Sequence, residues 1–458
     1  MRKIAVTILL FASVAAYGQH EHQQMEPKKK SSSGHEHHKM SDKSMGMPAG
    51  QEHMDMDMSS MSHSLSLNLP MNRNGSGTAW LPDASPMYGY MVHSKKWMYM
   101  FHGNLFLRYN KQDIANVGYR GDAKVDAPNW IMAMGQRRVG QNGLFRFNVM
   151  LSADALVMGG SGYPLLFQSG ESWEGRPLVD RQHPHDLFSE LSVSYSYALS
   201  KKADVYAYLG YPGEPALGAV AFMHRPSALY NPDAPLSHHW IDATHITFGV
   251  ATLGFRYGKF KIEGSSFTGR EPDENRYDFD KTRFDSRSAR LSFNPNENWS
   301  LQVSHGFIKS PEELHSGEDV YRTTASAIYS KRFGKDVILN GAAVWGLNKN
   351  PDHTGEHAAL LEAGASIKKL SLYGRYEWVQ KSAEELDLEK FYLHAHDLFN
   401  VNAITIGAAY DIVKLGVLRL AGGGQATMYV TPEDLEFVYG KTPIGAQAFI
   451  RLYPTLMR

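Results

Sequence analysis

Histidine and methionine are concentrated near the start of this 458-residue chain, between residues 19 and 63. Imidazole nitrogens bind Cu(II), zinc and nickel, whereas thioethers are soft donors that prefer Cu(I) or Ag(I), so a mixture can hold copper in either oxidation state. Thioethers have no proton to lose, and the chain contains no cysteine to compete with them. The candidate ligands are His20, His22, Met25, His35, His37, His38, Met40, Met45, Met47, His53, Met54, Met56, Met58, Met61 and His63.

The spacing of these residues suits ion capture by a flexible segment. Met54, Met56 and Met58 alternate along the chain, so a bend could bring two or three sulfurs onto one ion. Residues 19–69 show almost no hydrophobic periodicity and are rich in Ser, Lys, Asp and Glu, which predicts disorder. The alternatives are a solubilising linker or a His-rich stretch with no defined metal, but exposed methionines give a linker no benefit. We expect this tail to bind metal ions, copper or silver in preference to zinc or nickel, without covalent attachment.

A second group of potential ligands lies in two long segments rich in Pro and Gly, at residues 159–186 and 212–244. In an extended backbone His183 and His185 point the same way, and His238 or His239 would complete a site of three or four nitrogens. The alternative is that these histidines only form hydrogen bonds within structured loops. Such loops can also fold inward and constrict a pore. The other candidates nearby are Asp186, Met223, His224, Asp242 and His245.

The elements that would position these loops are strands. From Trp97 onward, apolar or aromatic residues occur at every second position over stretches of about 9 to 14 residues. In one such stretch Val193, Tyr195 and Tyr197 share a face, and Ser192, Ser194 and Ser196 share the other. Faces of this kind suit lipid outside and water inside. Tyr206, Tyr208, Tyr211, Tyr373, Tyr376 and Trp378 are expected to form aromatic girdles at the membrane interfaces.

The connections between these stretches alternate between tight turns and long polar loops, as in outer-membrane barrels. Tight turns are expected near residues 139–142, 200–203, 258, 295–298, 334–336, 368–369 and 412–414. The count gives about 16 strands, an even number that returns both termini to the periplasm. A soluble sandwich or propeller is the alternative, but its strands usually run about 5 to 6 residues. We therefore predict an all-β, transmembrane antiparallel β-barrel over residues 97–458.

The start of the chain and its charge set the remaining limits. Residues 1–18 have the basic start, short apolar run and small-residue site of a secretory signal peptide. Residues 70–96 are expected to be a linker or a plug. The formal net charge is zero, which gives no reason to expect nucleic acid as a partner. We expect an outer-membrane protein of a Gram-negative bacterium, with lipid as a partner and its tail in the periplasm.

Two stretches of the tail carry a family likeness. Residues 35–47 and 53–63 resemble the Met/His-rich N-terminal segment of the copper resistance protein B family, outer-membrane barrels of copper-resistance systems. Residues 74–82 and 181–186 resemble a group of poorly characterised exported proteins associated with heavy-metal efflux. The resemblance implies a role in copper, silver or other heavy-metal resistance or export.

Three functions remain open at this point. The first is metal binding and transport, with the tail capturing ions, the barrel offering a route and a periplasmic efflux adaptor or copper carrier as a partner. The second is a general porin or uptake channel whose tail only buffers metal, with Arg137, Arg138, Arg146 and Arg375 lining the lumen. The third is an outer-membrane lipase or protease, which we do not expect because neither a G-x-S-x-G motif nor a His-Glu-x-x-His helix occurs.

Overall fold

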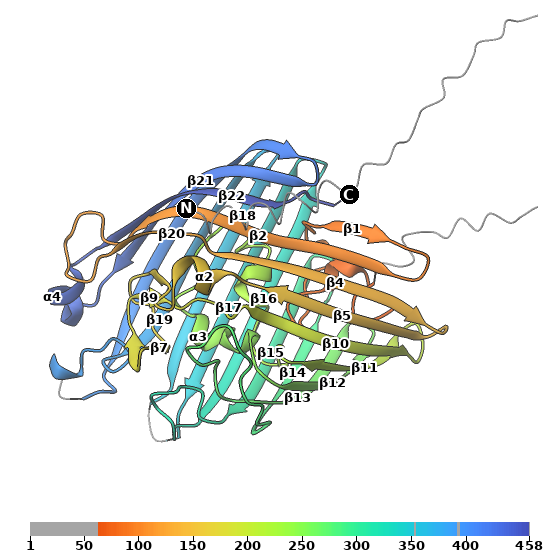
Figure 1. Ribbon diagram of the computed structural model, residues 1–458, viewed down its shortest axis with the longest axis horizontal. Helices are drawn as coiled ribbons and strands as arrows, with labels where there is room; N and C mark the ends of the chain where they lie inside the picture. The colour runs from red at the N-terminus through yellow and green to blue at the C-terminus, as the bar shows by residue number, and fades with distance from the viewer. Residues whose placement is uncertain (1–62, 352–353, 392–393, 458) are drawn as a thin grey trace, which may run out of the picture. The chain divides into compact units, whose positions relative to one another are not determined.

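The computed structural model describes residues 63–351, 354–391 and 394–457, and sixteen long strands dominate them (Figure 1). The strands run from 8 to 18 residues, a range that brackets the roughly 9–11 residues that a tilted strand needs to cross a bilayer. They are β2 (Met98–Lys111), β4 (Asn129–Val139), β5 (Gly143–Leu151), β10 (Phe188–Ala198), β11 (Ala203–Gly210), β12 (Val250–Tyr257), β13 (Phe260–Phe267), β14 (Ser286–Phe293), β15 (Trp299–Ile308), β16 (Val320–Phe333), β17 (Val337–Lys349), β18 (Glu356–Ile367), β19 (Leu370–Ser382), β20 (Leu398–Leu415), β21 (Leu418–Val430) and β22 (Ile444–Pro454).

These strands form a closed ring. Each pairs in antiparallel fashion with the next along the chain, and β22 returns to pair with β2, where Leu105 lies opposite Leu452. Two short strands complete the seam against β2, namely β1 (Tyr90–His93) and β3 (Ala123–Asp126). Closure leaves no unpaired edge, which a spanning sheet requires in lipid. The predicted transmembrane antiparallel barrel of about 16 strands is confirmed.

The wall has an apolar outer face and a polar inner face. On β10, Val193, Tyr195 and Tyr197 face outward, whereas the intervening serines are buried against the interior, as the alternation predicted. The same outward series continues with Leu253 on β12 and Ile406 on β20. This pattern is the one that lipid outside and a polar lumen select. Within the described residues, no helix is long and apolar enough to cross a membrane.

Three of the predicted girdle tyrosines face the interior instead. Tyr206 and Tyr208 are buried and donate hydrogen bonds to Glu263 and Glu190, and Tyr373 donates to Gln425 at 2.9 Å. Burial of the hydroxyl is tolerated because each one has an acceptor in the lumen. The girdle prediction was wrong for these three because an aromatic side chain fits either face of a barrel with a filled interior.

Tight turns lie at one end of the barrel, the turn end, and long loops at the other, the loop end. One predicted turn was misplaced. A bulge after Asp411 shifts the register of β20 against β21, so β20 continues to Leu415 rather than ending near residue 412. The chain reverses at Gly416, whose φ of +60° suits glycine.

Two of the long loops fold inside the ring. Residues 211–249 are almost entirely buried, and they form hydrogen bonds to inward-facing side chains of four wall strands. The pairs are Ala216 with Ser265 of β13, Gly218 with Ser304 of β15, Arg225 with Glu362 of β18 and Ser237 with Glu377 of β19. Residues 152–187 are also bonded to the wall, since the Pro164 carbonyl accepts a hydrogen bond from Asn110 of β2 at 2.7 Å. The barrel interior is therefore packed with its own chain.

The inner loops contain only short elements. In residues 152–187 these are α2 (Asp154–Met158), a pairing of β6 (Tyr163–Pro164) with β9 (Arg181–Gln182), and a hairpin of β7 (Glu171–Trp173) and β8 (Arg176–Leu178). In residues 211–249 they are η3 (Phe222–His224), α3 (His238–Ile241) and η4 (Ala243–His245). The outer loops carry η5 (Glu389–Phe391), η6 (Glu433–Leu435) and α4 (Glu436–Tyr439).

Residues 63–88 also lie within the barrel, along the inner wall near the turn end. The segment contains η2 (Met71–Arg73) and turns at Gly77, which has a φ of +51°. Trp80 lies beneath the Arg73 guanidinium, 4.8 Å from the ring centroid, and its carbonyl accepts from Ser300 of β15 at 3.0 Å. Thr78 accepts from Arg290 of β14 at 2.8 Å. Of the residues assigned to a linker or plug, 70–88 thus run inside the barrel and 90–93 form β1 in its wall.

A buried carboxyl joins this segment to the loop of residues 211–249. Glu214 packs against Gly77 and lies 4.0 Å from the Arg290 guanidinium, and its Oε1 has no hydrogen-bond partner among the described residues. Burial raises the pKa of Glu214 to about 8, with Arg290 opposing the shift. The folded protein therefore holds a proton here that the unfolded chain releases above about pH 4.5.

We predict that the free energy of unfolding falls as pH rises from about 4.5 to 8, because in this range the unfolded chain has released the proton that the folded state keeps. Glu214→Gln removes that contribution. Between pH 5 and pH 9 the wild type should lose more stability than the variant, by at least about 1.4 kcal/mol, the worth of one pKa unit. Urea unfolding in detergent measures this, with Glu433→Gln on an exposed loop as control. Parallel pH profiles for the wild type and Glu214→Gln would contradict the assignment.

Candidate metal centre

Five histidines from the two inner loops meet inside the barrel, toward the loop end. His183 and His185 flank Pro184 directly after β9, and a proline keeps the residue before it extended. His238 and His239 begin α3, and His245 ends η4. The start of α3 is fixed to the wall by two contacts, since Ser237 bonds Glu377 of β19 and Asn348 of β17 donates to the His239 carbonyl at 3.0 Å.

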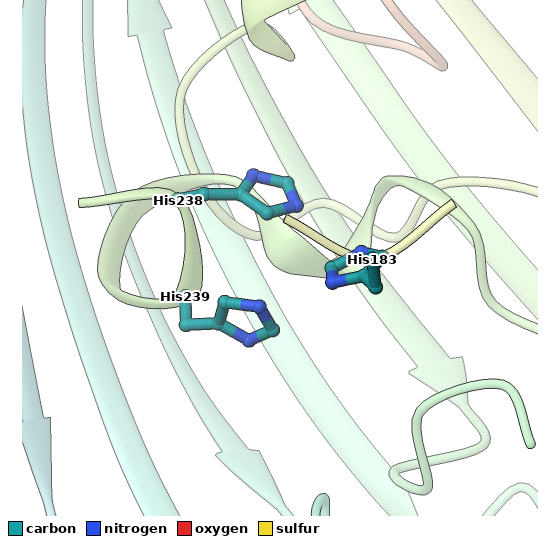
Figure 2. A group of neighbouring side chains, drawn as sticks. All are labelled: His183, His238 and His239. Carbon is teal, nitrogen blue, oxygen red and sulfur yellow. The ribbon is translucent and has the colours of Figure 1, made fainter. Parts of the chain in front are cut away.

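The tightest part of this cluster is formed by His183, His238 and His239. Figure 2 shows their rings turned toward one another from α3 and from the loop opposite. One ring nitrogen from each lies within 4.8 Å of the others, and all three side chains are buried. A tetrahedral metal with bonds of about 2.0–2.1 Å needs nitrogens roughly 3.4 Å apart, so small rotations would close the site. The histidines line a cavity of about 10 Å³, the space of roughly one water molecule.

The cluster continues from these three rings to the other two histidines. The ring centroids of His238 and His245 lie 5.1 Å apart, and those of His245 and His185 lie 5.4 Å apart. Phe222 packs edge-on against His238 at 5.6 Å and closes the side that faces the turn end. The imidazoles thus form a continuous buried row.

Each imidazole has an oxygen partner on one nitrogen. His185 contacts Asp154 at 2.7 Å, His238 contacts Asp242 at 2.6 Å, and the His245 Nδ1 lies 2.9 Å from the Asp242 carbonyl. His183 and His239 lie beside Glu171 and Glu271, at 3.1 and 3.4 Å. The Nε2 atoms of His185, His239 and His245 are buried with no hydrogen-bond partner in the part of the chain that the structure describes. An oxygen on one nitrogen and an unused lone pair on the other is the arrangement that orients histidine ligands toward a metal.

Three of the imidazoles, those of His183, His238 and His245, are held toward the neutral form. Burial, followed by the neighbouring histidines, lowers the pKa of His183 and of His245 well below the usual value. Burial also lowers the pKa of His238, although Asp242 opposes it. Neutral imidazole is the form that binds metal.

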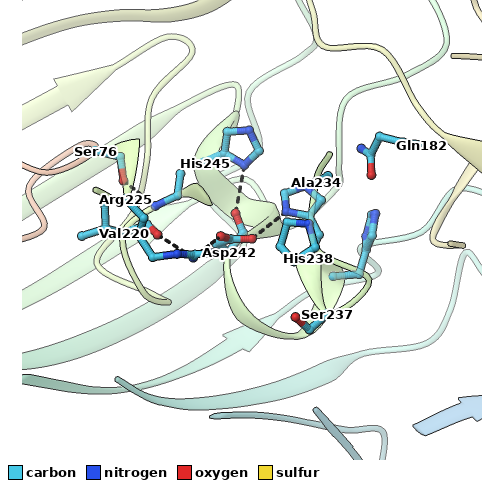
Figure 3. A network of polar contacts seen from close by, with 12 residues as sticks. Ser76, Gln182, Val220, Arg225, Ala234, Ser237, His238, Asp242 and His245 are labelled. Carbon is cyan, nitrogen blue, oxygen red and sulfur yellow. Dashed lines mark hydrogen bonds and ion pairs between the residues drawn. The ribbon is translucent and has the colours of Figure 1, made fainter. Parts of the chain in front are cut away.

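Asp242 lies between the histidines and Arg225, which carries the connection on to the wall; Figure 3 shows its contacts with Arg225, His238 and His245. It bonds His238 and also accepts from Arg225 at 3.0 Å, and Arg225 in turn donates to Glu362 of β18 at 2.9 Å. Burial acts to raise the pKa of Asp242, but His238 and Arg225 lower it to about 2. A permanently ionised carboxylate therefore lies directly behind the histidines.

A larger acidic cavity of about 280 Å³ adjoins the cluster on the side of the loop end. It shares His239, Glu271 and Glu171 with the histidine site and has only two arginines in its lining. Burial, with Glu271 as the nearest acidic neighbour, raises the pKa of Glu312 to about 8. Its acidic lining residues are Glu171, Glu271, Glu274, Glu312, Glu313, Glu318, Glu356, Glu384, Glu385, Asp387 and Glu389. Such crowding favours cations over anions.

The sequence prediction and the structure differ for some residues. His183, His185, His238 and His239 lie together, but His224 does not join them. It packs against His102 and Trp130 on the far side of Phe222, because η3 directs successive side chains to different sides. His63 forms a β-bridge with Pro70. The remaining predicted ligands lie outside the described residues: His20, His22, Met25, His35, His37, His38, Met40, Met45, Met47, His53, Met54, Met56, Met58 and Met61.

Only some of the arginines predicted to line the lumen face it. Arg146 and Arg375 are buried and face inward, whereas Arg137 lies against the Trp97 ring on the outer face and Arg138 is exposed at a turn. Arg137 was misassigned because consecutive residues of a strand face opposite sides of the wall. Arg138 has the inward register of β4, opposite Leu144, but its side chain lies exposed at the turn, where it donates to the Gln141 carbonyl at 2.9 Å.

Sequence reasoning missed the carboxylates Glu171 and Glu271 and the histidine His102. Glu171 and Glu271 come from loops about 100 residues apart, and nothing in their neighbourhoods marks them as partners. His102 had a usable signal: it alternates with Met98 and Met100 on the inward face of β2.

Comparison with known proteins gives a likeness of fold. No family model matches the chain, and no curated protein matches it. An anion-selective porin from Comamonas acidovorans is 13% identical, with 78% of this chain and 100% of that one covered and a TM-score of 0.47. OmpF of Salmonella typhi is 10% identical, covering 80% and 100%, with a TM-score of 0.48. OprB of Pseudomonas putida is 10% identical, covering 78% and 94%, with a TM-score of 0.46.

We predict that the triple substitution of His183, His238 and His239 by alanine removes one bound Ni(II) from the full chain. The tail is unchanged in this variant, so any Ni(II) that it binds cancels when the variant is compared with the wild type. Equilibrium dialysis with metal analysis measures the loss, and His305→Gln, an exposed histidine on β15, is the matched control. Equal Ni(II) binding by the triple variant and the wild type would show that the cluster is only a hydrogen-bonded loop.

Proposed function

We propose that this protein is an outer-membrane channel for a transition-metal cation, with the five-histidine cluster as the binding site along its route. The observation that carries the proposal is the convergence of His183, His238 and His239 inside a closed barrel, with the unused Nε2 atoms of the cluster buried beside them. A hydrogen-bonded loop would pair both nitrogens of a buried histidine, because an unpaired buried polar atom destabilises the fold. A bound cation supplies the missing partner.

The surrounding charges support a cation as the cargo. The acidic cavity leads from the loop end to His239, and Asp242 adds an ionised carboxylate behind the cluster. Arg276, the nearest cation to His183, is ion-paired with Glu171 and Asp186. A positive ion would therefore enter a region whose carboxylates outnumber its free cationic groups.

Copper is the ion that the tail favours. Imidazole alone accepts zinc, nickel or Cu(II), but the tail's methionines add a preference for Cu(I) or Ag(I). Export and resistance, with a periplasmic efflux adaptor or copper carrier delivering the ion to the tail, rest on the resemblance of the tail to the copper resistance protein B family. Under this proposal the barrel performs no covalent chemistry.

A general porin with a metal-buffering tail is the second candidate. The ring of 16 strands favours it, because a barrel of this size can enclose an aqueous channel. The inner loops weigh against a wide pore, since residues 152–187 and 211–249 occupy the interior and are bonded to its wall. The two candidates differ in which solute passes through the barrel and in whether that solute needs the histidines to pass.

Proteoliposomes separate the two candidates. Vesicles containing the full chain and a metal-responsive dye should take up Cu(II) faster than empty vesicles. The triple histidine variant should lose most of that uptake, whereas His305→Gln should retain it. A small neutral sugar should enter slowly in all three. Rapid sugar entry, with Cu(II) uptake equal in the wild type and the triple variant, would favour the general porin and contradict the metal channel.

A further inference from the structure

Six methionines and two histidines line a second cavity, of about 100 Å³, on the side of the turn end. It lies between the inner wall at β2 and β4, the segment of residues 71–88 and the loop of residues 211–249. Such a concentration of thioethers inside a polar barrel has no parallel elsewhere among the described cavities. The methionines are Met71, Met87, Met100, Met132, Met134 and Met223, and the histidines are His102 and His224.

Strand register places several of these donors side by side. Met100 of β2 lies directly opposite Met134 of β4, and His102 lies opposite Met132. Met132 in turn lies opposite Met150 of β5. Residues opposite each other on one face of an antiparallel pair have Cβ atoms about 4.5 to 5.5 Å apart. Sulfur and imidazole donors therefore share one patch of the inner wall.

The two histidines form a pair across the cavity. The His102 and His224 ring centroids lie 5.8 Å apart, and Trp130 packs against both, at 5.2 and 4.9 Å. The Nε2 of His102 is buried and has no hydrogen-bond partner among the described residues. His102 thus offers an unused ring nitrogen beside the thioethers.

The charges around this cavity exclude a hard divalent cation. Among its described lining residues there is no carboxylate, whereas Arg146, Arg225 and Arg451 are present. Arg146 donates to Asn148 at 3.0 Å and to Asn74 at 2.8 Å, and Arg451 donates to Asn104 at 2.7 Å. An ion that binds through charge alone would be repelled. An ion that forms strongly covalent bonds to sulfur and nitrogen would still be held.

Packing is the alternative role for these methionines, since flexible thioethers fill irregular gaps in protein interiors. Two observations speak against packing alone. Met71, Met100 and Met134 pack in one apolar cluster and Met132 and Met223 in another, yet a cavity of about 100 Å³ is bordered by both clusters. That cavity is also lined by His102, whose Nε2 has no partner among the described residues.

We propose that this cavity is a binding site for a soft monovalent cation, Cu(I) or Ag(I), held by thioethers of Met100, Met134 and Met223 with an imidazole of His102 or His224. It is separated from the five-histidine cluster by η3 alone, whose Phe222 packs against His238 and whose Met223 and His224 line this cavity. The site stands independently of the proposed function, because its donors and its ion differ from those of the histidine cluster.

Silver binding by the full chain tests the proposal, with Ag(I) as the probe. The variant Met100→Leu/Met134→Leu keeps the volume and removes two sulfurs. Met428→Leu, on the outer face of β21, is the matched control. Metal analysis after gel filtration against a competing chelator should show one Ag(I) fewer in the double variant than in the wild type and in the control. Heat-dependent migration on gels verifies that each barrel is folded.

Tryptophan fluorescence gives a second readout that locates the ion. Ag(I) should quench the emission of Trp130. The Trp130 signal is obtained by subtracting the emission of Trp130→Phe from that of the wild type. This quenching should disappear in the double methionine variant. Ni(II) binding by the histidine cluster should be unchanged in that variant, so a failure of this site and a failure of the proposed function are separable. Equal Ag(I) content in the wild type and the double variant, or quenching that survives the substitutions, would overturn the proposal.

Discussion

The guanidinium of Arg225 determines where the inner loop and its histidines lie. It is fully buried, bonds both carboxylate oxygens of Glu362 on the wall, and contacts Asp242 within the loop. Asp242 in turn contacts His238, and its carbonyl faces His245. Removing one member of such a buried network leaves a charge without a partner, at a cost of about 3–5 kcal/mol. The loop is therefore tied to one position in the barrel rather than merely enclosed by it.

This constraint explains the order of chemical environments through the barrel. Methionines and a histidine pair lie toward the turn end, the five-histidine cluster follows beyond Phe222, and the acidic cavity opens toward the loop end. From the turn end to the loop end, the donors thus change from thioethers through imidazoles to carboxylates.

The wall could be predicted from the sequence, because a membrane barrel imposes alternation on every strand. Ser192, Ser194 and Ser196 face inward as the pattern required. The interior could not be predicted in the same way. Tyr206 and Tyr208 look like girdle residues until Glu263 and Glu190 are seen to accept their hydrogen bonds.

For the candidate site, too, the sequence predicted some residues but not how they come together. His183 and His185 were recognisable from their spacing, and His238 and His239 from their place in a second long loop. Their meeting depends on how deep each loop folds, which is fixed by contacts such as Asn348 with His239 that no local pattern encodes. His224 was grouped with them by proximity in sequence, but one turn of η3 places it on the other side of Phe222. Glu171 and Glu271 had no sequence signal at all.

The most direct test of the central claim is anomalous diffraction from crystals of the full chain equilibrated with Ni(II). The account predicts an anomalous peak within bonding distance of His183, His238 and His239, in the cavity bounded by Glu171 and Glu271. A well-ordered barrel with no metal peak at these histidines would contradict it and leave the cluster with a purely structural role.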